Sequence, residues 1–63
     1  MPFVTIKIFE GRTTAQKRTM AKDVTEAIVK NLSCPVDAVY IDIIEMKQEN
    51  LSQGGKLFCD THK

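Results

Sequence analysis

The chain has 63 residues, of which 43% are hydrophobic and 27% are charged, and its formal net charge is +1. This length fits one small domain, residues 1–63, and the composition is typical of a soluble globular protein. The sequence lacks the basic stripe and aromatic platform that nucleic acid requires, and it lacks an apolar run of about 18 residues that could cross a membrane. We therefore expect a small molecule or another protein as the partner.

The cysteines and the small size bear on how the chain is stabilised. Cys34 and Cys59 are too few for a disulfide-rich secreted scaffold, and no leader pattern is present, so we expect free thiols in the cytoplasm. Cys59 and His62 are two possible ligands where zinc needs about four, so we expect no metal and a frayed tail. Small chains without disulfides or metals commonly gain stability by association.

The first predicted element is a strand from Phe3 to Phe9. Its residues alternate, with Val4, Ile6 and Ile8 on one side and Phe3, Thr5, Lys7 and Phe9 on the other. This period of two, in residues that favour strands, predicts a β-strand with two unlike faces.

A helix is predicted after the turn Glu10-Gly11-Arg12. Thr13 and Gln16 form the pattern that caps a helix start, and Pro35 prevents the helix from continuing far past Leu32. The apolar residues recur at steps of three and four, as expected of a stripe that faces the core; they are Met20, Ala21, Val24, Ala27, Ile28 and Leu32.

A second strand is predicted from Val39 to Met46, again with two unlike faces. A strand, a helix and a strand in succession form a βαβ unit, whose crossover normally makes the strands parallel. One helix covers only one face of a two-stranded sheet, and the other face carries Tyr40, Ile44 and Met46. We therefore expect an obligate oligomer.

The end of the chain predicts a short hairpin. The segment 47–53 is polar apart from Leu51, and Gly54-Gly55 suits a tight reversal before Lys56-Leu57-Phe58. The fold class expected from the whole chain is α/β (α+β): a βαβ subunit with parallel strands and a short C-terminal hairpin.

Several motifs at characteristic spacing resemble the 4-oxalocrotonate tautomerase family over nearly the whole chain. They are Met1-Pro2, the strand 4–9, Glu10-Gly11-Arg12-Thr13, Gln16-Lys17, Pro35, Glu45-Met46 and Gly54-Gly55. The resemblance implies βαβ subunits that pair into dimers and assemble as a hexamer, a trimer of dimers. It also implies an isomerase that needs no cofactor.

Pro2 matches the amino-terminal proline that acts as general base and acid in this family, provided that Met1 has been removed. An exposed Pro2 carries a secondary amine, and an apolar pocket with a nearby cation lowers the pKa of such an amine. The resemblance implies that this amine moves a proton on a small unsaturated 2-hydroxy or 2-oxo carboxylate such as 2-hydroxymuconate.

Arg12 matches the family arginine that binds a substrate carboxylate, since a guanidinium offers a planar fork of donors to two oxygens. Without the resemblance, a solvated turn arginine is the better interpretation. Lys7, Asp42, Glu45 and Lys56 are other polar candidates, but single charged residues on strands are more often solvated or ion-paired than catalytic.

Two positions depart from the family pattern. Tyr40 stands where a second arginine is found, which weakens the case for a dicarboxylate substrate, and Leu51 stands where an aromatic residue often walls the proline. We expect both to line a reshaped substrate site. Dehalogenase and decarboxylase reactions of the wider superfamily stay open. The alternative function is a catalytically degenerate oligomer of this fold that binds a small acid or a protein.

Overall fold

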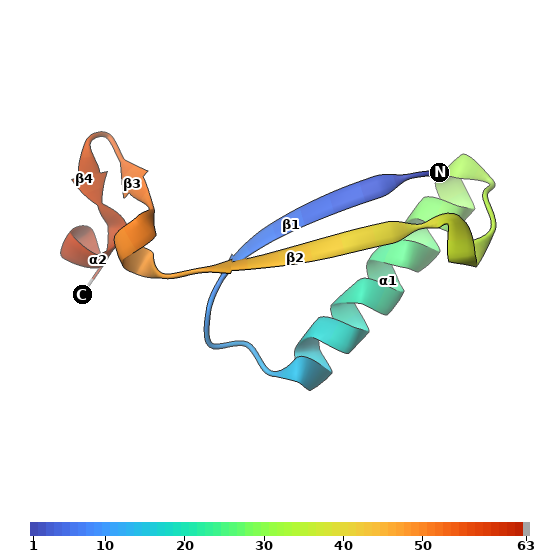
Figure 1. Cartoon of the computed structure of the whole chain (residues 1–63), viewed down its shortest axis with the longest axis horizontal. Helices are drawn as coiled ribbons and strands as arrows, with labels where there is room; N and C mark the ends of the chain where they lie inside the picture. Colours follow the sequence, from blue (N-terminus) through green and yellow to red (C-terminus); the bar gives the residue numbers. More distant parts are fainter. Residues whose placement is uncertain (63) are drawn as a thin grey trace.

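A computed structural model describes residues 1–62 and has the βαβ order that the sequence predicts. The chain runs through β1 (Phe3–Phe9), α1 (Thr14–Leu32), the 3-10 turn η1 (Val36–Ala38) and β2 (Tyr40–Met46). It continues through the 3-10 turn η2 (Gln48–Asn50), β3 (Ser52–Gln53), β4 (Lys56–Leu57) and α2 (Phe58–Thr61). In Figure 1, α1 lies along one side of the β1 and β2 pair, and the C-terminal segment lies beyond the far ends of these strands.

The strands β1 and β2 pair in parallel, with Phe3 opposite Tyr40 and Phe9 opposite Met46. The second strand begins one residue later than expected, because the N–H of Val39 donates to the carbonyl of Val36 and closes η1. Cross-strand pairs confirm which residues share a face. The rings of Phe3 and Tyr40 stack at 5.5 Å, and the hydroxyl of Thr5 donates to Asp42 at 2.8 Å.

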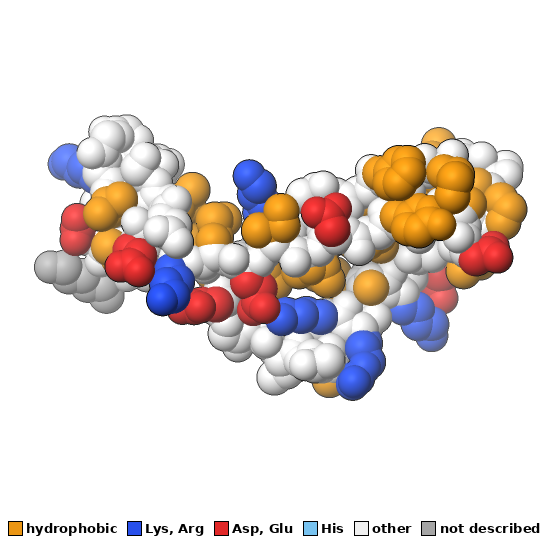
Figure 2. All heavy atoms as spheres, in the orientation of Figure 1, with side chains coloured by type: hydrophobic (Ala, Val, Ile, Leu, Met, Phe, Trp, Pro, Cys, Tyr) orange, Lys and Arg blue, Asp and Glu red, His pale blue; other side chains and the backbone are white. Residues whose placement is uncertain are grey.

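The sheet face away from α1 exposes large apolar side chains. Phe3 is 76% exposed, and Tyr40 and Ile44 are about half exposed. Figure 2 shows hydrophobic side chains gathered at the end of the sheet near the amino terminus. A single chain therefore leaves this face uncovered, as the unequal strand faces in the sequence predict.

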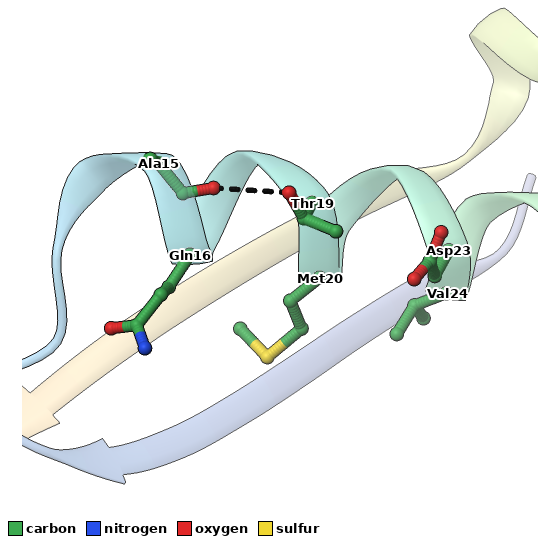
Figure 3. Close-up of a pocket in the computed structure, with 6 residues that line it drawn as sticks. All are labelled: Ala15, Gln16, Thr19, Met20, Asp23 and Val24. Carbon is green, nitrogen blue, oxygen red and sulfur yellow. Dashed lines mark hydrogen bonds between the residues drawn. The ribbon is translucent and has the colours of Figure 1, made fainter.

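The helix α1 packs its apolar stripe on the sheet without forming a closed core. Figure 3 shows Met20 and Val24 pointing from α1 toward the strands. These two residues and Ile28 are half-buried, but Ala27 and Leu32 are exposed, so two members of the predicted stripe were wrong. Val29, which was not assigned to the stripe, is half-buried.

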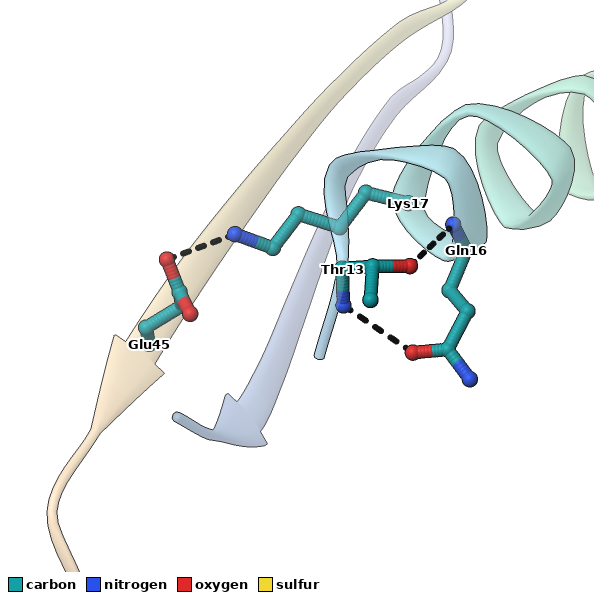
Figure 4. Close-up of polar contacts among 4 residues, drawn as sticks. All are labelled: Thr13, Gln16, Lys17 and Glu45. Atoms are coloured by element: carbon teal, nitrogen blue, oxygen red, sulfur yellow. Dashed lines mark hydrogen bonds and ion pairs between the residues drawn. The ribbon is translucent and has the colours of Figure 1, made fainter. Parts of the chain in front are cut away.

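The start of α1 has the predicted capping arrangement, drawn in Figure 4. The backbone N–H of Gln16 donates to the Thr13 hydroxyl at 3.1 Å, and the N–H of Thr13 donates to Oε1 of Gln16 at 3.0 Å. Lys17, one residue further along, forms an ion pair of 2.7 Å with Glu45 on β2. These contacts fix the N-terminal end of the helix against the C-terminal end of β2.

Residues Phe58–Thr61 form a short helix, so the frayed tail was a wrong expectation. Gly54 and Gly55 both have positive φ and form the predicted reversal between β3 and β4. The chain then enters α2, whose Phe58 ring lies 4.8 Å from the ring of Phe9. Because this aromatic contact joins the tail to the end of β1, the tail is held in place.

Candidate active site

A cavity of about 530 Å³ lies at the carboxyl ends of β1 and β2, a size typical of small-molecule sites. Arg12 and Leu51 line it, together with Lys7, Glu10 and Met46. Arg12 reaches this place because β1 ends at Phe9 and Gly11 turns the chain with a φ of +112°. The N–H of Glu10 donates to the carbonyl of Met46 at 2.9 Å, which ties the turn to β2.

Leu51 is held in the cavity wall by the backbone on both sides. Its N–H donates to the carbonyl of Gln48 at 3.4 Å, and its carbonyl accepts from the N–H of Phe58 at 2.8 Å. Phe58 contacts Phe9 through its ring. The C-terminal segment therefore positions an apolar, half-buried side chain beside Arg12.

Pro2 and Tyr40 lie at the opposite end of the sheet. The backbone N–H of Tyr40 donates to the carbonyl of Pro2 at 3.0 Å, so the two residues are neighbours at the start of the two strands. The exposed, stacked rings of Phe3 and Tyr40 lie beside Pro2.

The four candidate residues thus form two pairs and do not meet within one chain. Pro2 directly precedes β1 and Arg12 lies beyond its other end, and the seven strand residues at about 3.3 Å each span roughly 23 Å. A complete site with Pro2 and Arg12 needs residues from more than one chain. The predicted strand Phe3–Phe9 already implies this separation, because Pro2 directly precedes that strand and Arg12 lies in the turn after it.

The charges in the cavity are not neutralised by ion pairs. Among residues 1–62, the ion pair within 4 Å is the one between Lys17 and Glu45, which agrees with the expectation that Glu45 is solvated or paired. Lys7 and Arg12 therefore leave two cations at the cavity, beside the acidic Glu10. Glu10 and Met46 were not singled out as site residues, although both belong to motifs that carry the family resemblance.

A second hollow, of about 590 Å³, follows the surface of α1 and has a different character. It is lined by side chains of this one helix, among them Ala15, Thr19 and Met20 (Figure 3). It is lined by one acid, Asp23, and by no cation, unlike the cavity that holds Arg12. Within the described part of the chain, no three His, Cys, Asp or Glu side chains gather as metal ligands. No helix of residues 1–62 is long and apolar enough to span a membrane.

The parallel βαβ unit with its short hairpin is a fold shared with solved tautomerases. A structure from the 4-oxalocrotonate tautomerase isozymes of Methylibium petroleiphilum superposes with a TM-score of 0.90 at 35% identity, over 95% of this chain and 94% of that one. A heterohexamer 4-oxalocrotonate tautomerase from Chloroflexus aurantiacus superposes with a TM-score of 0.87 at 27% identity, over 95% and 97% of the two chains. The chain therefore has the tautomerase fold.

Sequence comparison agrees with the structural match. The family model described as tautomerase enzyme matches residues 2–61. A probable tautomerase of Streptococcus pneumoniae is 46% identical over 57 residues, which cover 90% of this chain and 95% of the relative. The chain belongs to the tautomerase family, as the motif pattern predicts.

Proposed function

We propose that this chain is a cofactor-independent tautomerase that moves a proton on a small unsaturated 2-hydroxy or 2-oxo carboxylate such as 2-hydroxymuconate. The observation that carries the proposal is the cavity that joins Arg12 to the apolar Leu51, in a tautomerase-family chain with Pro2 at the other end of β1. Arg12 binds the carboxylate, Leu51 walls the site, and Pro2 of a second copy supplies the amine.

A two-fold arrangement of two β1 strands brings Pro2 of one chain close to Arg12 of the other. β1 pairs with β2 along one edge, and in residues 1–62 its other edge has no strand partner. Antiparallel pairing of this edge with β1 of a second copy reverses the strand direction. Each Pro2 then comes to the Arg12 end of its neighbour, and two identical sites form.

The proposed reaction needs a base that also serves as an acid. The Pro2 amine takes the proton from the hydroxyl of the dienol, the oxygen electrons form the carbonyl, and the conjugated double bond shifts toward a distant carbon. The protonated amine then returns the proton to that carbon, so no electrons enter or leave the substrate. An apolar wall and the Arg12 cation favour the neutral amine before the reaction, and the Tyr40 hydroxyl donates a hydrogen bond to the developing oxyanion.

The open surface of the chain supports an obligate oligomer, which we propose is a hexamer built as a trimer of dimers. No side chain among residues 1–62 is fully buried. The radius of gyration is 15.0 Å, whereas a compact domain of this length has roughly 11 Å. The accessible surface is 5033 Å², about 950 Å² more than the scaling for a compact monomer gives.

Sedimentation equilibrium tests the assembly directly. We expect the protein to sediment as a hexamer at micromolar concentration, and we expect unfolding to shift to lower temperature on dilution because folding depends on association. A folded monomer that persists at micromolar concentration contradicts this expectation.

The state of the amino terminus tests the function. Protein whose Met1 has been removed, as verified by mass spectrometry, is expected to interconvert 2-hydroxymuconate or phenylenolpyruvate with its oxo isomer, as followed by ultraviolet absorbance. A matched preparation that retains Met1 holds Pro2 as a tertiary amide without a basic lone pair, and it is expected to be inactive. Equal rates in the two preparations contradict the role of Pro2.

A second candidate is a catalytically degenerate oligomer that binds a small acid or a protein. It is favoured by Tyr40, which places a neutral ring stacked on Phe3 where the family has a second arginine. Amino-terminal sequencing of protein from its own host separates the two candidates, because a free Pro2 supports the enzyme and a retained Met1 supports the binder. In both cases we propose a cytoplasmic protein; Cys34 and Cys59 are free thiols.

A further inference from the structure

Lys7 lines the same cavity as Arg12, although the two residues come from different elements. Lys7 lies on β1, two residues before the strand ends, and Arg12 lies in the turn that follows. Both line the hollow that Leu51 closes on its apolar side. Two cationic residues therefore line this cavity.

The cavity keeps an excess of positive charge. Glu10 is the one acid among the residues that line it, and no ion pair within 4 Å joins it to Lys7 or Arg12 in the described part of the chain. Two cations against one carboxylate leave room for a ligand with more than one negative group, since opposite charges a few ångströms apart attract more strongly at a partly desolvated site than in water.

Tyr40 stands where the family has a second arginine, so this chain lacks one positive charge at that position, and Lys7 could supply a positive charge in its place. Tyr40 gives the site a neutral donor, so a second anionic group of the substrate needs its cation elsewhere. The ammonium of a lysine is a point charge on a flexible stem with three donors, which suits a carboxylate whose position is fixed by the rest of the ligand. Lys7 has this chemistry in the cavity that also holds Arg12.

We propose that Lys7 is a specificity-determining residue that binds the second carboxylate of the substrate, so that the site prefers dicarboxylates over monocarboxylates. The inference rests on the proposed tautomerase function and deepens it by naming the residue that selects dicarboxylates. Arg12 binds the first carboxylate in either class of ligand, whereas Lys7 discriminates between the classes.

Two unreactive probes of matched shape test this preference without turnover. Trans,trans-muconate and sorbate share a six-carbon diene and differ at one end, where muconate has a carboxylate and sorbate a methyl group. Isothermal titration of the assembled protein with Met1 removed is expected to show tighter binding of muconate. In Lys7→Met, muconate affinity should fall by about tenfold, the usual scale for a lost charged hydrogen bond, while sorbate affinity stays within about twofold.

Matched variants identify the cause of the change. Lys30→Met removes the same charge from the exposed last turn of α1 and should leave both affinities unchanged. Lys7→Arg keeps the cation and should keep the preference for muconate. If Lys7→Met does not assemble, Lys7→Gln replaces it in the same comparison with Lys7→Arg.

The outcomes separate this inference from the proposed function. Equal affinity of the wild-type protein for the two probes, or equal weakening of both by Lys7→Met, overturns the role of Lys7 even if the protein turns over 2-hydroxymuconate. Binding of muconate that depends on Lys7, in a protein without turnover of any enol acid, supports the inference and contradicts the tautomerase.

Discussion

Replacement of Pro2 by alanine is expected to lower kcat/KM for 2-hydroxymuconate by at least about 10²-fold, the lower end of what a positioned acid-base group contributes. Alanine is also small enough to permit removal of Met1, so the variant has a free amine of its own. That amine is primary and rotates freely, whereas the ring of Pro2 fixes the direction of the lone pair. The measurement is steady-state kinetics on protein whose terminal residue has been verified by mass spectrometry.

Pro35 offers a matched control for this substitution. It is exposed and precedes η1, close to the end of the sheet where Pro2 lies, yet it has no part in the proposed chemistry. Pro35→Ala should keep activity within about twofold while the oligomer stays intact by sedimentation. If Pro2→Ala is as active as Pro35→Ala, Pro2 is not the base.

Replacement of Arg12 by glutamine is expected to lower kcat/KM by roughly 10²-fold, because two charge-assisted hydrogen bonds to the substrate carboxylate are lost. Glutamine keeps much of the length and polarity of the side chain, so the turn at Gly11 is preserved. Most of the change should appear in KM, since the carboxylate is bound in both the ground state and the transition state.

Arg18→Gln on the exposed surface of α1 provides the control, because it removes the same charge outside the cavity. Arg12→Lys should be intermediate, since a lysine restores the charge without the planar fork of donors. If Arg12→Gln and Arg18→Gln have the same KM as the wild-type protein, the carboxylate is bound elsewhere.

Local signals in the sequence were enough to predict the elements and their order. Thr13 and Gln16 mark the start of α1, and the alternation in 3–9 defines β1 to the residue. Gly54-Gly55 marks the hairpin, because two successive residues with positive φ favour glycine. These signals operate over a few residues, so no knowledge of the partner chain is needed to interpret them.

Signals that depend on tertiary contacts were missed. The short helix at Phe58–Thr61 has no strong pattern of its own, and it is held through the Phe58 ring on Phe9, nearly fifty positions away in sequence. Leu32 continues the apolar period of α1, but its side chain is 63% exposed in the single chain. Periodicity indicates which residues share a face and not how far that face is covered.

The sequence predicted which residues belong to the candidate site, but it did not predict which of them lie next to one another. Arg12 and Leu51 meet because the turn after β1 and the segment after β2 leave the sheet at the same end. Pro2 and Tyr40 meet at the other end through the parallel register. Lys7 was set aside as a solvated strand lysine, and only the cavity shows that it shares a hollow with Arg12.

The separation of Pro2 from Arg12 along β1 has a genetic consequence under the proposed pairing. A chain without the amine and a chain without the guanidinium carry complementary defects. In a dimer of two such chains, one of the two shared sites lacks both the amine and the guanidinium, and the other site has both groups. Two inactive alleles expressed in one cell therefore restore part of the activity, which a protein that completes its catalytic centre within each polypeptide cannot do.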